Sequence, residues 1–339
     1  MSPVLPPGKG FTDFTVLDLD ERGNFLDPGT GRPVPHDDMA IFLGRSLTLP
    51  GETTDIVVFV HGWNNTVADA AASAARLFNS IEIGLAEQCR RYPGLAGYRG
   101  YYIAVRWPSQ SNPLPTGYRR IRDRAHAMTT NGHAEYVLAA LLGYLNTLRE
   151  QPTLGPPALQ SRSGQYLHLV GHSFGGRFLG EAVKEAANPQ GPAVLQLRPR
   201  NPDYPYTVDN LLVFQMAAHP EVFAHEFAAV LDDAPIHGPV TLTFSEADRA
   251  NCVWHRLIEH APGIGCQGAT TWPARSITLR PVEQDYTDHE LYHPLINVDA
   301  SWLYRRGRRV LPQGAHSDFW YPESIHLLLT LAAHARNRP

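Results

Sequence analysis

Residues 165–176 read Gln-Tyr-Leu-His-Leu-Val-Gly-His-Ser-Phe-Gly-Gly. The first six form the apolar run of a buried strand, and the stretch after Ser173 has a helical pattern. Glycines two positions before and two positions after Ser173 leave room for neighbouring backbone in a tight strand-to-helix turn. The hydroxyl of Ser173 then projects from the sheet edge at a helix N-terminus, where developing negative charge is favoured. A bare G-x-S-x-G pattern is common, but in this context it predicts a nucleophilic serine.

The chain around this turn alternates short apolar strands with stretches of helical period, which is typical of a parallel sheet wrapped by helices. The expected strands are Ile56–Val60, Tyr101–Arg106, Tyr166–Val170, Leu211–Met216, Val240–Phe244 and Ile296–Ala300. The expected helices cover residues 66–90, 131–149, 174–187, 222–231 and 322–335, and Thr66 and Asp69 resemble a capping box at the first. We therefore expect an α/β fold with a mostly parallel central sheet flanked by helices.

The first 54 residues have a different character. Residues 14–26 alternate apolar and polar side chains around a Gly-Asn turn, which predicts a β-hairpin. No composition shift marks a boundary elsewhere in the 339 residues. We expect an N-terminal extension with a β-hairpin over residues 1–54 and one α/β domain over residues 55–339.

Composition narrows the possible partners. Lys and Arg number 29 against 33 Asp and Glu, so the net charge of -4 offers no basic surface for nucleic acid. The longest apolar runs fall short of the roughly 18 residues that would suggest a membrane span. The N-terminus lacks the charged and apolar regions of a secretory signal, so a soluble, cytoplasmic protein is expected. The oligomeric state stays open.

Cysteine usage is sparse. Cys89, Cys252 and Cys266 form an odd set without a CxxC pair, which argues against a disulfide framework and against a thiolate zinc site. Cys252 and Cys266 flank a predicted loop, and a bond between these two stays open.

Several segments together resemble a known superfamily. They are residues 58–66 (Val-Phe-Val-His-Gly-Trp-Asn-Asn-Thr), 106–109 (Arg-Trp-Pro-Ser), 171–175 (Gly-His-Ser-Phe-Gly) and 314–318 (Gly-Ala-His-Ser-Asp). Over about residues 55–335 the chain resembles the α/β hydrolases, and it is similar to a bacterial subgroup of serine-esterase-like proteins of unknown function. The resemblance is specific for a fold and a catalytic triad and weak for a substrate.

The acid of such a triad follows the serine in the chain and lies just past a late strand. Asp248 meets this pattern, because it lies in the loop behind the expected strand Val240–Phe244. Glu246 in the same loop and Glu221 after the preceding strand are alternatives, and surface charge is the ordinary role of both. Asp248 is the predicted acid.

The base must be chosen by position, because the sequence has 16 histidines. His316 lies between the last expected strand and the last expected helix, where this fold carries its histidine. His326 and His334 fall within that helix, and packing is the expected role of both. His61 precedes the serine in the chain, and the side chain of His172 should point away from the serine on so tight a turn, so we expect both to be structural. The predicted triad is Ser173, Asp248 and His316.

A serine hydrolase also needs two backbone N–H groups aimed at the tetrahedral oxyanion. Phe174, directly after the serine, supplies one at the start of its helix. The resemblance implies that Trp63, in the loop after the first strand, supplies the other, and a core aromatic without a donor role is the alternative for this residue. Phe174 and Trp63 are the predicted oxyanion hole.

A second motif points to different chemistry. His289, Glu290 and His293 match the HExxH pattern of zinc metallopeptidases, which requires a continuous helix. Pro294 follows directly and disfavours helical geometry at His293. A histidine-rich loop is the favoured interpretation, so no metal and no cofactor is expected.

These observations predict a serine hydrolase that cleaves small-molecule carboxylic esters. Peptidase, thioesterase and acyltransferase activities use the same triad, and a zinc metallopeptidase or a non-catalytic binding module remain alternatives from other classes. No long insertion interrupts residues 217–239, which favours a small or accessible substrate. Six aromatic residues lie in or near loops that we expect around the serine, with substrate contact and core packing as equal possibilities: Trp107, Tyr118, Trp254, Phe319, Trp320 and Tyr321.

Overall fold

The structure is a computed structural model that describes residues 11–112, 114–150, 165–188, 208–232, 236–271, 273–307 and 311–337. Its centre is an eight-stranded sheet in the order β1-β3-β2-β4-β5-β6-β8-β7, and all paired strands run parallel. The strands are β1 (Thr15–Asp18), β2 (Asp55–Val60), β3 (Gly100–Arg106), β4 (Tyr166–His172), β5 (Asn210–Phe214), β6 (Val240–Phe244), β7 (Ala274–Thr278) and β8 (Leu295–Asp299). The predicted α/β class with a mostly parallel sheet is confirmed.

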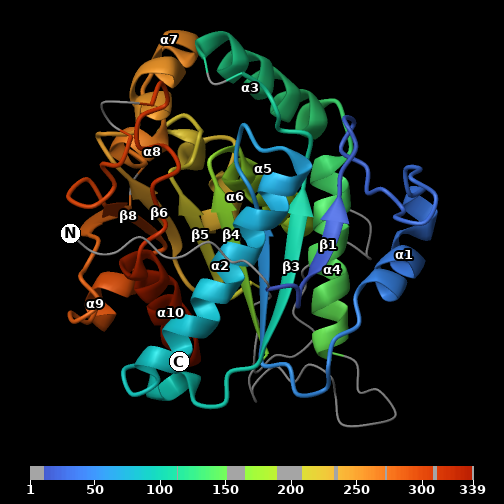
Figure 1. Ribbon diagram of the computed structural model, residues 1–339, viewed down its shortest axis with the longest axis horizontal. Coiled ribbons are helices and arrows are strands. Elements are labelled where there is room, and N and C mark those ends of the chain that lie inside the picture. The colour runs from blue at the N-terminus through green and yellow to red at the C-terminus, as the bar shows by residue number, and fades with distance from the viewer. Residues whose placement is uncertain are drawn as a thin grey trace.

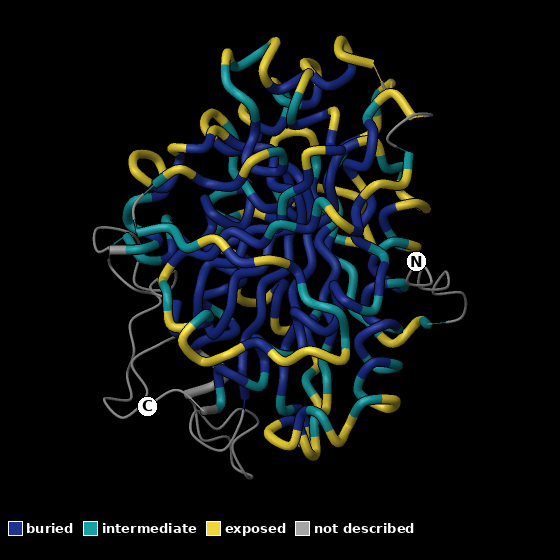
Figure 2. The backbone as a smooth tube through the Cα atoms, turned by 90° about the vertical axis from the view of Figure 1, so that its left-hand side faces the viewer, coloured by how far each residue is buried: buried dark blue, intermediate teal, exposed yellow. Residues whose placement is uncertain are grey.

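The central strands are apolar on both faces because helices cover both sides of the sheet. Every residue of β2, β4 and β5 is buried, and Figure 2 shows the strands as the buried centre of the molecule. Along β2, Val57 and Phe59 pack into one apolar core, and Ile56, Val58 and Val60 into the other. This alternation fixes the register, since a shift by one residue would exchange the two faces.

Each face of the sheet has its own set of helices (Figure 1). One face packs against α2 (Val67–Gln88) and α10 (Pro322–Asn337), and the other against α3 (Pro115–Thr130), α4 (Ala134–Glu150) and α5 (Phe174–Ala187). The short helices are α1 (Met39–Ser46), α6 (Ala228–Asp232), α7 (Arg256–Glu259), α8 (Ile264–Gln267) and α9 (Asp288–Leu291). Three-residue 3-10 turns are η1 (His36–Asp38), η2 (Pro93–Leu95) and η4 (Val222–Ala224), and η5 (Ala250–His255) is a π-helical segment. In the described ranges, no helix combines the length and apolar character that a membrane crossing requires.

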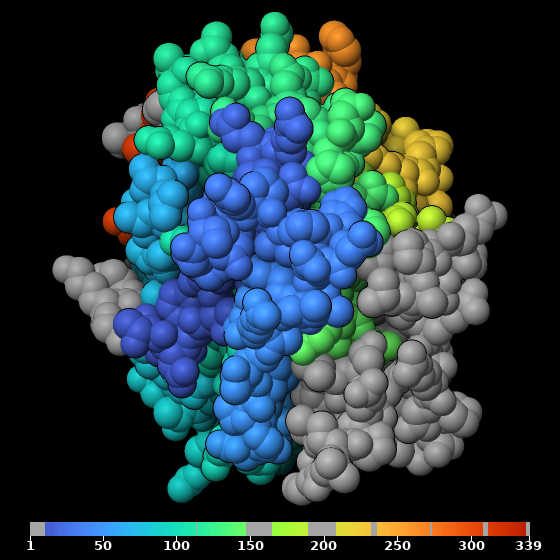
Figure 3. All heavy atoms as spheres, turned by 90° about the vertical axis from the view of Figure 1, so that its right-hand side faces the viewer, coloured from blue at the N-terminus to red at the C-terminus, as the bar shows by residue number. Residues whose placement is uncertain are grey.

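The N-terminal segment is part of the sheet. The predicted hairpin is present as an antiparallel bridge between Leu19 and Phe25, and its first arm, β1, pairs in parallel with β3 at the sheet edge. Leu17, Phe25 and Phe42 are buried in the core that α3, α4 and α5 cover. Figure 3 shows this segment in blue, spread over one side of the molecule. The predicted domain boundary between residues 54 and 55 stays a prediction.

Several elements differ from the sequence-based expectation, and the short helices α1, α7, α8 and α9 lie outside the predicted helix ranges. Helix α3 and edge strand β7 were not predicted. The single helix expected over residues 222–231 is divided into η4 and α6, because His225 leaves helical geometry at φ -130° and ψ -88°. The capping box at Thr66 and Asp69 is present as predicted.

Candidate active site

Ser173 occupies the tight turn between β4 and α5. Its backbone has φ 55° and ψ -123°, a strained conformation for a residue with a side chain. The surrounding glycines explain how the turn forms: a Cβ on Gly175 would lie 2.1 Å from the carbonyl oxygen of Val60, and one on Gly176 would lie 2.2 Å from Val213. A methyl group at either position would push the helix away from the strands, so only glycine permits this turn.

The structure brings His316 to the serine. His316 lies in the loop between β8 and α10, and the Ser173 hydroxyl donates a hydrogen bond to its Nε2 atom at 2.7 Å. The backbone of His316 is also fixed, because the Nε2–H of His172 donates to its carbonyl oxygen at 2.8 Å. His172, expected to be structural, therefore holds the predicted base in place.

Asp248 completes the hydrogen-bonded chain. The Nδ1–H of His316 donates to Oδ2 of Asp248 at 2.9 Å, and the aspartate is fully buried in the loop after β6. The two alternative acids, Glu246 and Glu221, have exposed side chains. Of the three carboxylates considered, the structure places Asp248 at the imidazole.

The acid loop and the base loop are joined through their backbones. Asp248 and Gly314 form an isolated antiparallel bridge, and the N–H of Ala315 donates to the carbonyl of Ala247 at 2.9 Å. Gly314 has φ 66°, and a Cβ there would lie 2.4 Å from the same carbonyl oxygen. This close approach fixes the separation of acid and base before their side chains interact.

Two polar residues around Asp248 were not identified from the sequence. Gln215 follows β5 with φ 49° and donates through Nε2 to Asp248 at 3.1 Å and to the carbonyl of Ala315 at 2.9 Å. Asn251 donates to the same carboxylate twice, from its backbone at 3.0 Å and from Nδ2 at 2.8 Å. With the imidazole, the aspartate accepts four hydrogen bonds, which hold it in one orientation.

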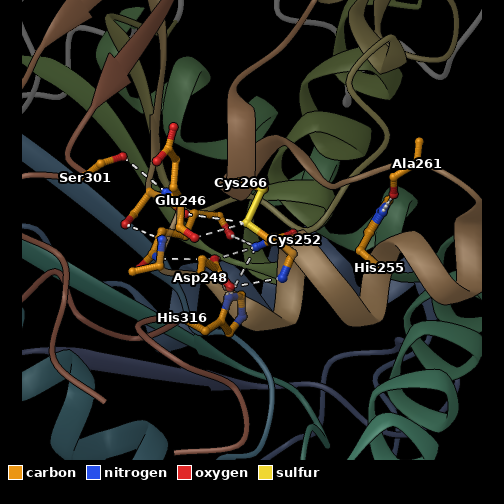
Figure 4. The surroundings of a disulfide bond; sticks show 12 residues. Glu246, Asp248, Cys252, His255, Ala261, Cys266, Ser301 and His316 are labelled. Carbon is orange, nitrogen blue, oxygen red and sulfur yellow. Dashed lines mark hydrogen bonds and ion pairs between the residues drawn. A yellow bond between two sulfur atoms is a disulfide. The ribbon is translucent and has the colours of Figure 1, made fainter. Parts of the chain in front are cut away.

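A disulfide lies next to the acid loop. Cys252 and Cys266 are bonded, which settles the pairing that the sequence left open and joins η5 to α8. Figure 4 shows the bond beside Asp248 and His316. The N–H of Cys252 donates to the carbonyl of Asp248 at 2.8 Å. The third cysteine, Cys89, is free and exposed.

The loop after β2 lies against the serine. A Cβ on Gly62 would come within 2.9 Å of the Cβ atom of Ser173, so only glycine allows this approach. Trp63 follows directly, and Asn65 holds the loop by donating through Nδ2 to the carbonyls of Gly62 and Trp63 at 2.9 and 3.1 Å. Within the described residues, the backbone N–H groups of Trp63 and Phe174 have no hydrogen-bond partner. Two unpaired donors thus flank the serine.

His61 holds the same loop through hydrogen bonds with backbone groups. The backbone N–H of Trp107 donates to its Nε2 at 3.1 Å, and its own Nδ1–H donates to the carbonyl of Gly62 at 2.9 Å. Burial lowers the pKa of His61 to about 4. Burial, together with the nearby His316, lowers the pKa of His172 to about 3. Both imidazoles are therefore neutral near pH 7, and both hold backbone groups of the site.

The serine is covered in this structure. Its relative exposure is 0%, and Trp63, Tyr118 and Trp254 form a buried aromatic cluster with ring centroids 5.5 to 6.2 Å apart. Above the carboxyl ends of the strands, α3 and α7 lie together (Figure 1) and are joined by an ion pair between Arg122 and Glu259 at 2.8 Å. The accessible site suggested by the absence of an insertion at residues 217–239 is not what the structure shows, because α3 and η5 supply a cover from other parts of the chain.

A cavity of about 140 Å³ opens beside His316. Of the six aromatic residues expected near the serine, Phe319 and Trp320 line this cavity, as does Trp63. Tyr118 and Trp254 belong to the aromatic cluster, whereas Trp107 stacks on His61 and Tyr321 donates to Asp318.

The HExxH residues are engaged in local structure. Glu290 closes a capping box with Thr287 at the start of α9 and pairs with Arg280 at 2.6 Å. Arg275 donates to the Nε2 atom of His293 at 2.9 Å, so a guanidinium occupies the side of this ring that a metal would need. The helix ends at Leu291, before His293, as the following proline led us to expect. Among the described residues, no cluster of three or more His, Cys, Asp or Glu side chains could hold a metal ion.

A parallel sheet with a serine at a strand-to-helix turn, followed along the chain by an aspartate and a histidine that reach it, defines the class of α/β hydrolases. Residues 46–281 match the family "Alpha/beta hydrolase of unknown function (DUF900)". Because this match covers more than half of the chain, the protein belongs to that family. The matched range contains Ser173 and Asp248 and ends before His316.

Other comparisons add little. The chain is similar to a solved structure, a lipase-esterase related protein from Clostridium acetobutylicum ATCC 824, with 13% identity and a TM-score of 0.19 over 56% of this chain. The chain spans about half, 53%, of the length of that protein. At this level the likeness carries no argument about function. Comparison with curated proteins gave no significant match.

Proposed function

We propose that this protein is a serine hydrolase that cleaves carboxylic esters through an acyl-enzyme intermediate, with Ser173 as nucleophile, His316 as base and Asp248 as acid. The supporting observation is the buried chain of hydrogen bonds from the Ser173 hydroxyl through His316 to Asp248, at 2.7 and 2.9 Å. No other serine in the described residues has its hydroxyl bonded to a histidine that in turn contacts a carboxylate.

In the first half of the reaction, Oγ of Ser173 attacks the carbonyl carbon of the ester while its proton passes to Nε2 of His316. The carbonyl oxygen becomes an oxyanion, which accepts hydrogen bonds from the unpaired N–H groups of Phe174 and Trp63. The carbon–oxygen bond to the alcohol then breaks, and His316 returns the proton to the departing alkoxide. Asp248 fixes the tautomer of the imidazole and stabilises its charged form.

In the second half, a water molecule attacks the acyl-enzyme carbonyl and gives its proton to His316. The bond to Ser173 breaks, the serine oxygen regains the proton, and the carboxylic acid leaves. The net reaction consumes one water and yields one acid and one alcohol. The site as described needs no cofactor for either half.

A fluorophosphonate probe tests the nucleophile. It should label the protein at Ser173, as peptide mass spectrometry would show, and Ser173→Ala should remove both the label and hydrolysis of p-nitrophenyl acetate. Ser80→Ala is the matched control, because Ser80 is equally buried but donates to a backbone carbonyl within α2. Labelling that persists in Ser173→Ala would contradict the assignment.

The bond type is tested with a ladder of esters, thioesters and amides that share one acyl group. Esters should be hydrolysed fastest, the activity should survive a chelator, and His316→Ala should remove it. Loss of activity with the chelator would revive the zinc peptidase alternative, and a response near background across the whole ladder would exclude the esterase.

A further inference from the structure

The cavity beside His316 bears on the alcohol part of the substrate. This inference rests on the proposed function: after the carbon–oxygen bond breaks, the departing alkoxide takes its proton from His316, so it must lie against this imidazole. The cavity of about 140 Å³ is lined by His316 itself. Its volume is close to the roughly 150 Å³ of a cavity that holds one benzene molecule, so it has room for about six heavy atoms.

The lining is polar but carries no formal charge. Of its described residues, none has a carboxylate, an ammonium or a guanidinium group, and Arg76 lies outside it, against the ring of Trp320. The histidines His61 and His172 are neutral, since burial depresses the pKa of each. A phosphorylated alcohol would lose its hydration there without gaining a counter-ion. A cationic alcohol such as choline would be repelled by the guanidinium of Arg76 on the ring of Trp320.

Besides the imidazoles of His61, His172 and His316, the polar groups of the lining are amides and hydroxyls. They come from Asn64, Asn65, Gln313, Ser73 and Ser317, and each type can both donate and accept hydrogen bonds. The rings of Trp63 and Trp320 add flat apolar surface that C–H groups can pack against. Neutral two-way hydrogen-bonding groups beside aromatic rings match an alcohol that has several hydroxyls on a short carbon skeleton.

Two buried polar atoms of the lining residues lack a partner. Nε1 of Trp63, a donor, and Oε1 of Gln313, an acceptor, have no hydrogen bond within the described structure. Buried polar atoms are almost always paired, so these two atoms leave hydrogen-bonding capacity of the lining residues unused.

We propose that this cavity binds the alcohol part of the ester substrate, and that this alcohol is an uncharged polyol of about the size of glycerol or of part of a sugar ring. The natural substrates are then esters of short polyols, in which the hydroxyls not esterified hydrogen-bond to the lining.

The direct test compares glyceryl 1-monobutyrate with propyl butyrate, which has the same acyl group and the same three-carbon alcohol without the free hydroxyls. The wild-type kcat/KM, measured by proton release, should be about tenfold higher for the glyceryl ester, mainly through KM, because one or two net hydrogen bonds are gained. Butyrylcholine should be hydrolysed less efficiently than propyl butyrate. Measuring 6-O-butyryl glucose as well distinguishes a glycerol-sized site from one that takes a sugar. A higher kcat/KM for either polyol ester than for propyl butyrate supports the proposal.

Variants of the cavity-lining residues test whether these residues cause the preference for the glyceryl ester. Gln313→Leu and Ser73→Ala should each bring the ratio between glyceryl and propyl esters towards one, mainly by lowering kcat/KM for the glyceryl ester. Gln110→Leu is the matched control, because this glutamine is exposed in a neighbouring pocket that does not contain His316. A wild-type ratio near one, a ratio unchanged in both lining variants, or faster hydrolysis of butyrylcholine would overturn the polyol assignment and leave the ester hydrolase intact.

If the wild-type enzyme hydrolyses none of these esters, the proposed function fails, but the cavity can still be judged. Titration calorimetry on Ser173→Ala should then show tighter binding of glyceryl monobutyrate than of propyl butyrate, and equal binding of the two would overturn the polyol assignment by itself.

Discussion

Asp248 is proposed to orient the imidazole of His316. Its carboxylate accepts hydrogen bonds from other residues besides that imidazole. Gln215 and Asn251 together donate three of its four hydrogen bonds. Gln215 also donates to the carbonyl of Ala315, the residue before His316, so one amide bridges the acid and the base loop. We interpret Gln215 as a positioning residue, which acts on the reaction only through Asp248 and His316.

This role predicts a loss of kcat with little change in KM. Gln215→Leu removes both bridging donors, and a displacement of about 1 Å at a catalytic group costs on the order of a hundredfold in rate. We expect kcat on p-nitrophenyl acetate to fall by about tenfold to a hundredfold, measured alongside circular dichroism to show that the fold persists.

Two further variants separate positioning from simple destabilisation. Gln215→Glu keeps the shape but places a second carboxylate against Asp248, so it should lower kcat more than Gln215→Leu does. Gln284→Leu, in a loop away from the triad, should leave kcat unchanged. Equal kcat values for wild type and Gln215→Leu would remove the positioning role.

Some residues of the candidate site could be predicted from the sequence more readily than others. Ser173 is marked by glycines whose spacing has a steric cause, and His316 by its place between the last strand and the last helix. Gln215 and Asn251 carry no comparable signal. Gln215 falls inside the strand expected over Leu211–Met216, and only its positive φ, visible in the structure, turns its side chain out of the strand pattern.

Among the elements, those with a continuous apolar pattern were predicted well. Strand β6 and helix α5 match their expected bounds, because buried strands and an amphipathic helix each have a strong local signal. Edge strand β7 has only one buried residue, Ile277, and therefore shows neither a continuous nor an alternating apolar run. Helix α3 is rich in arginine, so its buried positions Tyr118, Ile121 and Ala125 do not stand out in the sequence as an apolar stripe.

The disulfide ties the π-helical segment η5 to helix α8. The segment carries Asn251, which orients Asp248, and Cys252, which ties it to Cys266 in α8, 14 residues further along the chain. Opening a loop of this length removes about 3 kcal/mol of stability in the chain-entropy account. Reduction, or Cys252→Ser, should lower the free energy of unfolding in urea by about that amount and should also lower kcat, because Asn251 is released with the segment.

The free cysteine supplies the control. Cys89→Ser changes an exposed residue and should alter neither stability nor kcat. Thiol counting should find one reactive thiol before reduction under denaturing conditions and three afterwards. Three thiols at the start, or unchanged stability once two further thiols have appeared, would contradict this account of η5.

Over the whole molecule, buried histidines make stability depend on pH. The pKa of His61 is about 4 in the folded protein against an ordinary value of 6.5, because burial penalises its charged form. Below pH 6.5 the unfolded chain takes up a proton at this position that the folded chain does not. The stabilising contribution is therefore complete above pH 6.5 and is lost as the pH falls towards 4.

The variant His61→Gln isolates this effect. Between pH 7.5 and pH 5, its free energy of unfolding should fall by about 2 kcal/mol less than that of the wild type, since one proton uptake is removed. The comparison with wild type is needed because burial raises the pKa of Glu181 to about 7, and proton uptake there by the folded chain has the opposite effect on stability. Urea titrations at the two pH values measure the difference. His225→Gln, on the surface, is the control, and a pH profile shared by wild type and His61→Gln would contradict the prediction.

The Cys252–Cys266 bond also bears on where the chain can mature. Disulfides form and last in oxidising surroundings such as the periplasm or the extracellular space, whereas glutathione and thioredoxin keep cytosolic thiols reduced. The bond next to Asp248 would therefore close in an oxidising environment and stay open in a reducing one. In a glutathione-rich host the chain would accumulate as a dithiol with a loosened acid loop, and expression in an oxidising host would yield the closed form.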